Sequence, residues 1–542
     1  MEFDLIIRNG TVIDGTGRPR FRADLGLLEG RIAAISQGQP LQGQRVLDAD
    51  GLAVAPGFID VHSHADWILP LPDHDVLMAP LLLQGITTVV AGHCGFSPAP
   101  VTDTAIPLAD AYSEGLRERA FEYGWRSFGE FLAEMEQCGL LLNAAFLVGH
   151  GALRIAVMGS SSGAPDSDQL EDLRRGTRLA MAEGALGLSA GLAYVPGIFA
   201  CNDELLPLLR IVAELGGVFT VHGRAYTWVS PFYSPMIGGT AHNIRSVREL
   251  LGLAKQAEVK LQLSHQIFVG RRTWRTHRTV LRDIERAADG GLDVAFDAYP
   301  YTCGNTTINV VFPAWFLADF DHHINDAGSL KRLKREMDLL RWTLGLDYGD
   351  ITLLRAEAAD LSELEGLDFA TIARRLRLPD FDAYIHVART SHGGARVLLY
   401  TYSGDETHEA PLRAALSHPL CSFMTDTIVT QLGRSNPASY GTYPRILGRY
   451  CRELGLFSLE DAVRRMTFYP AQRMNLAGVG HIAEGAAADL VLFDPATIAD
   501  RTTRDRPDVP PAGIHAVLIA GQIVAQEGRL LPGPRRGRVL RR

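Results

Sequence analysis

Pro56-Gly57-Phe58-Ile59-Asp60-Val61-His62-Ser63-His64-Ala65-Asp66 is an apolar, β-branched run that ends in two histidines. Side chains two positions apart on a strand point to the same face, so His62 and His64 can direct their ring nitrogens at one point. Imidazole suits zinc and related transition metals. Barrel enzymes place their chemistry at the carboxyl ends of their strands. The stretch therefore predicts an early barrel strand that carries the first ligands of a metal site.

Seven further strand-like stretches follow, and helical patterns such as 243–258, 278–290 and 459–474 lie between them. Strands that alternate with helices predict a parallel sheet. Eight strands with intervening helices are typical of a closed (β/α)8 TIM-like barrel, and a doubly wound open sheet is the competing α/β fold. The eight expected strands are 57–64, 87–94, 143–150, 185–190, 217–222, 259–265, 292–299 and 421–426.

A chain of 542 residues is too long for one compact unit. Both ends are rich in short strand-like runs, which predicts one small β domain made of residues 1–55 and 478–542. The barrel is expected at 56–302 and 417–477. Residues 303–416 are too long for a single crossover and have their own helical pattern at 329–340, so we expect an insertion that covers the barrel mouth. The basic tail, 535–542, is expected to be a solvated end.

The overall composition is that of an ordinary globular protein, with 46% hydrophobic and 21% charged residues. A net charge of −9 argues against nucleic acid or an anionic membrane as the main partner. The first residues lack the features of a signal peptide, and no run of about 18 uncharged apolar residues is present. The six cysteines show no regular spacing, which argues against a disulfide framework. We expect a cytoplasmic protein.

Potential ligands stand at the ends of several predicted strands, and these ends meet at one mouth in a parallel barrel. Hydrolysis of an amide near neutral pH needs a nucleophile better than water, which a divalent metal can provide. A cysteine thiolate favours zinc over magnesium or calcium and could bridge two ions. A carboxylate beside the water can accept its proton and return it to the leaving amine, and Asp426 is the candidate for this role. Besides His62 and His64, the strand-end candidates are Cys94, His150, His222, His265 and Asp426.

Several motifs in the chain resemble those of the D-aminoacylase (N-acyl-D-amino-acid deacylase) family of the amidohydrolase superfamily. The resemblance covers nearly the whole chain. The Gly-x-Ile-x-x-Gly…Ala-Asp-Leu signature at 480–490 is shared across the superfamily, whereas Gly-His-Cys-Gly at 92–95 is narrower. The other matching pieces are 56–64, 187–194, Ser264-His265, 297–301 and 440–445.

This resemblance implies a barrel with a small β-sandwich and a zinc site. The family's tight zinc ion would bind Cys94, His222 and His265. A second, weaker metal site would use His62, His64, the shared Cys94 and Asp426. The substrate is expected to be a small N-acyl compound, and a homo-oligomer is compatible with this interpretation. The residues expected to contact the substrate are His150, Tyr194, Arg224, Tyr299 and Asn305.

The chain departs from the family where the family holds the substrate carboxylate with a lysine, an arginine, a tyrosine and a serine. Tyr299 matches the tyrosine, but the lysine, arginine and serine positions hold Ile267, Ala438 and Asn305. Charge-assisted pairs are the strong contacts of such sites. Either Arg224, Arg434 or another cation replaces the missing ones, or the substrate has no carboxylate there.

The leading hypothesis is a zinc-dependent hydrolase of a linear amide, acting on an N-acyl-D-amino acid or on a more apolar N-acyl amine or amide. A cyclic amide hydrolase or a deaminase on the same scaffold is the second hypothesis. A non-catalytic scaffold protein is the third, but such proteins usually lack ligands, and none of the six expected ligands is missing here.

Overall fold

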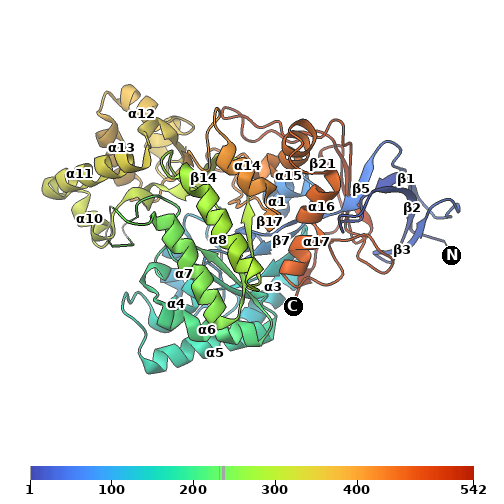
Figure 1. Ribbon diagram of the computed structural model, residues 1–542, viewed down its shortest axis with the longest axis horizontal. Coiled ribbons are helices and arrows are strands. Elements are labelled where there is room, and N and C mark those ends of the chain that lie inside the picture. Colours follow the sequence, from blue (N-terminus) through green and yellow to red (C-terminus); the bar gives the residue numbers. More distant parts are fainter. Residues whose placement is uncertain (1, 231, 235–237) are drawn as a thin grey trace.

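The computed structural model describes residues 2–230, 232–234 and 238–542, and its centre is a barrel of parallel strands (Figure 1). One sheet has the order β17-β13-β12-β11-β10-β9 and another continues it as β8-β7-β6. Leu147 alone separates β8 from β9, so the two together count as one strand of the barrel. The barrel strands are β6 (Phe58–Asp60), β7 (Ile86–Ala91), β8 (Asn143–Phe146), β9 (Val148–Gly149), β10 (Gly187–Gly191), β11 (Val218–His222), β12 (Lys260–Leu263), β13 (Val294–Ala298) and β17 (Cys421–Phe423).

The barrel closes just beyond its first and last strands. Ser63 and Thr427 form a parallel bridge, and the N–H of Asp426 donates to the carbonyl of His62 over 3.0 Å. Every residue of β7, β10, β11 and β13 is buried, as expected for parallel strands covered on both faces. The predicted (β/α)8 barrel is therefore confirmed, and the open doubly wound sheet is excluded.

Helices of the barrel layer bury one face each. In α7 (His242–Ala257) the buried leucines and valine recur at helical spacing, and α8 (His277–Asp289) buries Val280, Leu281 and Ile284. The predicted helix at 459–474 is divided at Thr467. The other helices of this part are α1 (His74–Leu82), α2 (Ile106–Ser113), α3 (Phe128–Cys138), α4 (His150–Met158), α5 (Ser167–Glu183), α6 (Asn202–Glu214), α14 (Ala410–Ser417), α15 (Ala438–Arg445), α16 (Leu459–Met466) and α17 (Phe468–Arg473).

Both ends of the chain contribute to one nine-stranded sheet beside the barrel. In β18, Leu490 and Leu492 face the core of this sheet, whereas Val491 and Phe493 belong to the core of the barrel. The alternation of side chains along one strand thus joins the two units. The strands are β1 (Leu5–Val12), β2 (Phe21–Leu28), β3 (Arg31–Ser36), β4 (Val46–Asp48), β5 (Ala53–Pro56), β18 (Leu490–Phe493), β19 (Ile514–Ile519), β20 (Gln522–Gln526) and β21 (Arg529–Leu530).

The insertion after β13 forms a separate lobe, drawn in yellow in Figure 1. Its sheet has the order β14-β16-β15, and residues just after β16 join the loop that follows β12: Val269 bridges Tyr402, and the N–H of Ser403 donates to Phe268. By contrast, α14 packs against α8 and β17 and so belongs to the barrel layer. The elements of the lobe are β14 (Cys303–Thr307), β15 (Ile351–Arg355), β16 (Arg396–Tyr400), α9 (Ala314–Leu317), α10 (Phe320–His323), α11 (Ala327–Leu344), α12 (Phe369–Leu376) and α13 (Asp380–Thr390).

The expectation of a solvated basic tail is wrong. Residues Val539–Leu540 form β22, which pairs in parallel with Ala144 and Ala145 of β8. The side chain of Leu540 is 9% exposed and packs with the residues inside the barrel. Arg541 binds the carboxylate of Glu136 in α3 at 2.9 Å. Two apolar residues within a basic segment are enough to dock it, because β8 offers a free edge.

Within the described part of the chain, no helix combines the length and the apolar character needed to cross a bilayer.

Candidate metal centre

Three of the predicted ligands form a compact, buried cluster. The sulfur of Cys94 lies 3.8 Å from Nδ1 of His222 and 3.6 Å from Nε2 of His265, and these two nitrogens are 2.8 Å apart. The side chains come from the loop after β7 and from the ends of β11 and β12. All three residues are at most 8% exposed. One thiol and two imidazoles converging on one point form a donor set that zinc accepts.

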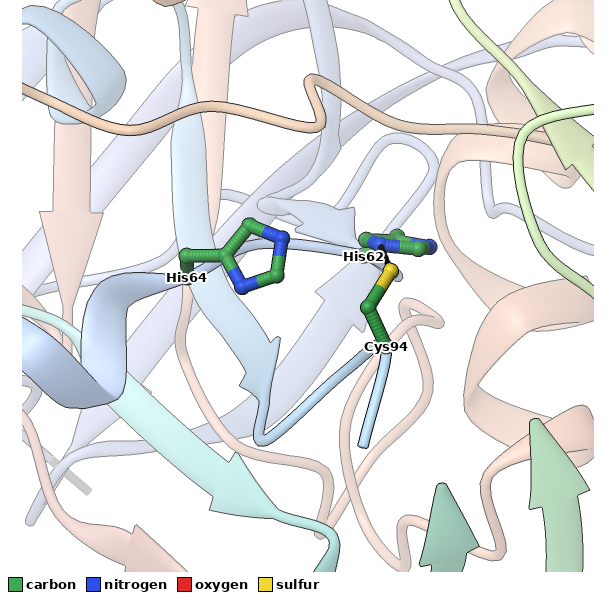
Figure 2. A group of neighbouring side chains, drawn as sticks. All are labelled: His62, His64 and Cys94. Carbon is green, nitrogen blue, oxygen red and sulfur yellow. Dashed lines mark hydrogen bonds between the residues drawn. The ribbon is translucent and has the colours of Figure 1, made fainter. Parts of the chain in front are cut away.

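A second group shares the same sulfur. Nε2 of His62 lies 3.5 Å from the sulfur of Cys94, and Oδ1 of Asp426 lies 3.4 Å from that nitrogen and 3.8 Å from Nε2 of His64. Figure 2 shows the sulfur of Cys94 directed at the ring of His62, with the ring of His64 turned toward the same space. The potential ligand atoms of His62, His64 and Cys94 all lie within 4.8 Å of one another, as do those of His62, His265 and Asp426.

The backbone at this site is strained. Cys94, His265 and Asp426 have φ angles of 55°, 31° and 50°. Non-glycine residues rarely adopt this left-handed region, and such conformations cost of order 1–3 kcal/mol each. Each residue lies where the chain leaves a barrel strand, and the reversed φ turns its side chain toward the cluster. Strain repeated at three of the six predicted ligands points to a functional site.

The loop that carries Cys94 is held by strand β10, on the far side of β8 and β9. The hydroxyl of Ser189 accepts the N–H of Gly95 over 3.0 Å and donates to the carbonyl of Gly92. A Cβ at Gly92 would lie 2.1 Å from the carbonyl oxygen of Leu147, so the loop reaches this position only with glycine there. The motif Gly-His-Cys-Gly thus has a structural reason as well as a chemical one.

The loop that carries Asp426 is fixed to the first strand. The N–H of Thr425 donates to Oδ1 of Asp60 over 2.9 Å, and its hydroxyl donates to Oδ2. On the other side, the N–H of His64 donates to the carbonyl of Thr427 over 3.3 Å. Closure of the barrel and placement of Asp426 therefore depend on the same contacts.

Burial controls the electrostatics of the cluster. It lowers the pKa values of His64 and His265 to about 4, and it also lowers those of His62 and His222 well below the usual value of an imidazole. The rings are therefore neutral near pH 7 and have lone pairs free to bind a cation. Burial also raises the pKa of Asp426 well above its usual value, and the nearby carboxylates Asp297 and Asp60 raise it further. Asp426 retains 23% exposure of its side chain.

Two residues to which the sequence assigned no role support the cluster. Oδ1 of Asp297 lies 3.4 Å from Nδ1 of His62 and accepts the N–H of His265 over 2.6 Å. The hydroxyl of Tyr226 accepts the N–H of Gly223 over 2.9 Å and donates to the carbonyl of Ser264 over 3.0 Å. Asp297 stands in the matching piece 297–301, and that is the signal by which it could have been found, whereas Tyr226 lies outside the matching pieces.

Of the five residues predicted to contact the substrate, three have surroundings that suit this role. The ring centroid of Tyr194 lies 4.4 Å from that of His222, beside the cluster. Tyr299 is 3% exposed, and its hydroxyl has no hydrogen-bond partner among the described residues; the same is true of Oδ1 of Asn305 in β14. Asp426 is the charged group that most raises the pKa of Tyr299 after burial. These three residues are therefore compatible with a substrate site.

His150 and Arg224 are engaged elsewhere. Nε2 of His150 lies 2.8 Å from Oε1 of Glu204, whose other oxygen pairs with Arg154 in the same buried group. Nε of Arg224 donates to Glu249 over 3.1 Å, and its NH2 group donates to the carbonyl of Ala200. The structure does not bring either residue into the cluster of His62, Cys94 and Asp426.

Known proteins show the same motifs and the same fold. The chain is 33% identical to a D-aminoacylase of Alcaligenes xylosoxydans xylosoxydans, over 100% of this chain and 98% of the relative. It is also 33% identical to an N-acyl-D-glutamate deacylase of the same organism, over 100% of this chain and 97% of the relative. The crystal structure of an N-acyl-D-glutamate deacylase from Bordetella bronchiseptica, complexed with zinc and a phosphonate mimic of the tetrahedral intermediate, matches with a TM-score of 0.81, 31% identity and full coverage of both chains.

A profile of the Amidohydrolase family matches residues 45–525, which include the whole barrel and four strands of the small sheet, β4, β5, β18 and β19. The resemblance carried by the motifs is therefore confirmed, and the chain belongs to the amidohydrolase family, within which it is similar to the D-aminoacylases over its full length.

Proposed function

We propose that this protein is a zinc-dependent amidohydrolase that cleaves the linear amide of a small N-acyl compound. The observation that carries the proposal is the convergence of Cys94, His222 and His265, with His62, His64 and Asp426 on the other side of the same sulfur. Relatives similar over the full chain are deacylases of N-acyl-D-amino acids, and one of them was crystallised with zinc.

The donor set fits zinc, because sulfur and imidazole nitrogen are the ligands that zinc prefers. Cys94, His222 and His265 would hold the tight ion. His62, His64 and Asp426 would hold a second, weaker ion that shares Cys94. A zinc ion bound here would act as a Lewis acid on the amide carbonyl and would make water a better nucleophile.

Asp426 is proposed as the general acid and base. Its carboxylate is the one predicted ligand group with substantial exposure, 23%, so it can reach both the attacking water and the substrate. Oδ of Asp426 would accept the proton of the water and deliver it to the nitrogen of the leaving amine. Tyr194, Tyr299 and Asn305 would contact the substrate, and Arg224 and His150 would support the surrounding walls.

We also propose a role for each of the two parts of the chain outside the barrel. The small sheet of 1–55 and 478–542 would support the barrel, and the lobe inserted at 303–416 would cover its mouth. The hydrogen bonds between 268–270 and 401–403 support this assignment, since they join the lobe to the loop after His265. Six cysteines without a disulfide support a location in the cytoplasm.

The test combines metal analysis with hydrolysis assays on N-acyl compounds. We expect Asp426→Asn to retain the tight zinc ion and to lose almost all hydrolysis, and Cys94→Ala to lose the metal. An active Asp426→Asn enzyme would contradict the acid–base assignment. Zinc-loaded protein that opens hydantoin-like rings or deaminates heterocycles, but leaves every linear N-acyl compound intact, would favour the second hypothesis.

A further inference from the structure

Four tyrosines stand around the proposed metal centre. The ring centroids of Tyr194 and Tyr226 lie 4.4 and 4.8 Å from that of His222. Tyr299 and Tyr402 meet at Gly304, where a Cβ would lie 2.5 Å from the Tyr299 hydroxyl and 2.3 Å from the ring of Tyr402. The four tyrosine rings thus come from the loops after β10, β11 and β13 and from the inserted lobe.

Two polar atoms beside Gly304 lack hydrogen-bond partners within the described residues: the hydroxyl of Tyr299 and Oδ1 of Asn305. A buried polar atom without a partner is costly, so it is a place where a ligand can contribute a hydrogen bond. Both groups are uncharged, so neither can neutralise the charge of an anionic ligand.

The cations near the mouth are already engaged. Outside the inserted lobe, the loops that follow the barrel strands contain no lysine, and the arginines in and beside these loops, with one exception, contact an acidic or aromatic side chain. The pairs are Arg117–Asp110, Arg119–Asp73, Arg126–Asp103, Arg154–Glu204, Arg224–Glu249, Arg271–Asp350, Arg272–Trp342, Arg275–Trp228 and Arg445–Asp500. Beside β14 in the lobe, Arg396 lies near Glu357, which also binds Arg355. The exception is Arg434, which is exposed to solvent.

The side chain two residues beyond His265 is also uncharged. Ile267 is 8% exposed and packs in an apolar cluster with Tyr299 and Tyr402. The carboxylates of Asp297 and Asp426 each lie 3.4 Å from a ring nitrogen of His62. A substrate carboxylate placed here would leave water and meet these carboxylates, and Arg434, the one arginine of the mouth loops without an acidic or aromatic partner among the described residues, is exposed to solvent.

We propose that the substrate is an N-acyl amine whose amine half carries no carboxylate, with a neutral polar group that Tyr299 and Asn305 can bind. This inference rests on the proposed deacylase function and narrows it. The protein would then share the hydrolytic centre of its relatives and differ from them in the compound that it releases.

The direct test compares two substrates that differ only in the carboxylate. Zinc-loaded enzyme is assayed with N-acetyl-2-phenylethylamine and with N-acetylphenylalanine of each hand, and the released amine is measured. We expect kcat/KM to be at least tenfold higher for the phenylethylamine derivative. A higher kcat/KM for either enantiomer of N-acetylphenylalanine would overturn the inference.

A binding measurement separates this inference from the proposed function. The zinc-loaded Asp426→Asn variant is titrated with the same compounds in a calorimeter. If the wild type hydrolyses neither compound while the variant binds the neutral one more tightly, the deacylase function is wrong and the preference for neutral ligands stands. Tighter binding of N-acetylphenylalanine, or binding of neither compound, contradicts the preference itself.

Two substitutions test the residues that carry the argument. Ile267→Lys supplies a cation, and we expect it to raise kcat/KM for N-acetylphenylalanine relative to the neutral substrate at least tenfold, whereas the matched Ile267→Met should not. Arg434→Gln removes the arginine of the mouth loops that has no acidic or aromatic partner among the described residues, and the exposed Arg175→Gln in α5 serves as its control. If Arg434→Gln selectively lowers hydrolysis of the acid, Arg434 binds the carboxylate and the inference is wrong.

Discussion

Oδ1 of Asp297 lies 3.4 Å from Nδ1 of His62, at the end of the ring opposite to Cys94. The same oxygen accepts the backbone N–H of His265 over 2.6 Å. One carboxylate therefore contacts two of the histidines in the proposed metal centre. Carboxylates behind ligating histidines fix the ring orientation and raise the basicity of the nitrogen that binds the metal.

We expect Asp297→Asn to weaken zinc binding about 10–100-fold, the usual effect of removing such a partner. The fold should tolerate the change, because Gln262, which now donates to Asp297, has a free Oε1 atom and can rotate its amide toward the new NH2 group. Zinc affinity is measured by competition with a chelating dye. Asp489→Asn, another buried carboxylate that accepts bonds from Asn143 and Ala520, is the control and should bind zinc normally.

The Tyr226 hydroxyl joins the loops of His222 and His265, since it accepts from Gly223 and donates to Ser264. Tyr226→Phe retains the ring packed on both histidines but removes both hydrogen bonds. We expect about a tenfold loss of zinc affinity with an unchanged circular dichroism spectrum. Tyr233→Phe, which removes a hydroxyl bound to Glu249, should leave the affinity unchanged. Equal affinities of wild type and Tyr226→Phe would contradict the positioning role.

The sequence predicted the barrel and its strand-end residues well, for a physical reason. Buried parallel strands are continuous apolar runs, and in His62, Cys94, His222, His265 and Asp426 a reactive side chain follows each run. The positions of these residues at the mouth depend on topology alone. Tyr226 and Asp297 were missed as supporting residues because their roles depend on which loops lie side by side, and periodicity carries no such information.

The docked tail was missed for a different reason. Between Arg538 and Arg541 only Val539 and Leu540 are apolar, and so short a run has no recognisable strand period. Its binding depends on the free edge of β8. The third barrel strand pairs with β10 only in its β9 part, through Val148–Leu188 and Gly149–Ser189, which leaves Ala144 and Ala145 of β8 to pair with β22. In the tail, Arg538 and Arg541 stay exposed to solvent, while Val539 and Leu540 between them dock on β8.

Leu540→Ala should lower the free energy of unfolding by about 2–3 kcal/mol, the lower part of the range for a buried leucine, because Leu540 lies at the edge of the barrel core. Deletion of residues 538–542 should lower it further, since the pairing of β22 with β8 is also lost. Denaturant unfolding measures both. Arg536→Ala, a change at an exposed position of the same tail, is the control. A deletion with the stability of the full chain would show that the tail does not support the barrel.

Asp326 caps helix α11 of the inserted lobe, where its Oδ2 atom accepts the N–H of Ser329 over 2.6 Å. This hydrogen bond lowers the pKa of Asp326 below 3.8. The folded state therefore binds the proton less readily than the unfolded state, so the stabilisation is present above pH 3.8 and is lost as the pH falls through the lowered pKa. Asp326→Ala should be less stable than wild type at pH 7, and the difference should shrink toward pH 3. Thermal unfolding at several pH values measures it, and a difference that grows in acid would contradict the cap.

Zinc should stabilise the folded protein, because the cluster of Cys94, His222 and His265 exists only in the folded chain. Free zinc at 100 times its Kd would add about 2.7 kcal/mol to the free energy of unfolding. Removing the metal with a chelator should therefore lower the Tm, and adding zinc should restore it. Cys94→Ala should abolish this shift. Cys421→Ala, which changes a buried cysteine in β17, should lower the Tm of both forms but keep the response to zinc. A zinc-induced shift of equal size in Cys94→Ala would place the stabilising ion elsewhere in the chain.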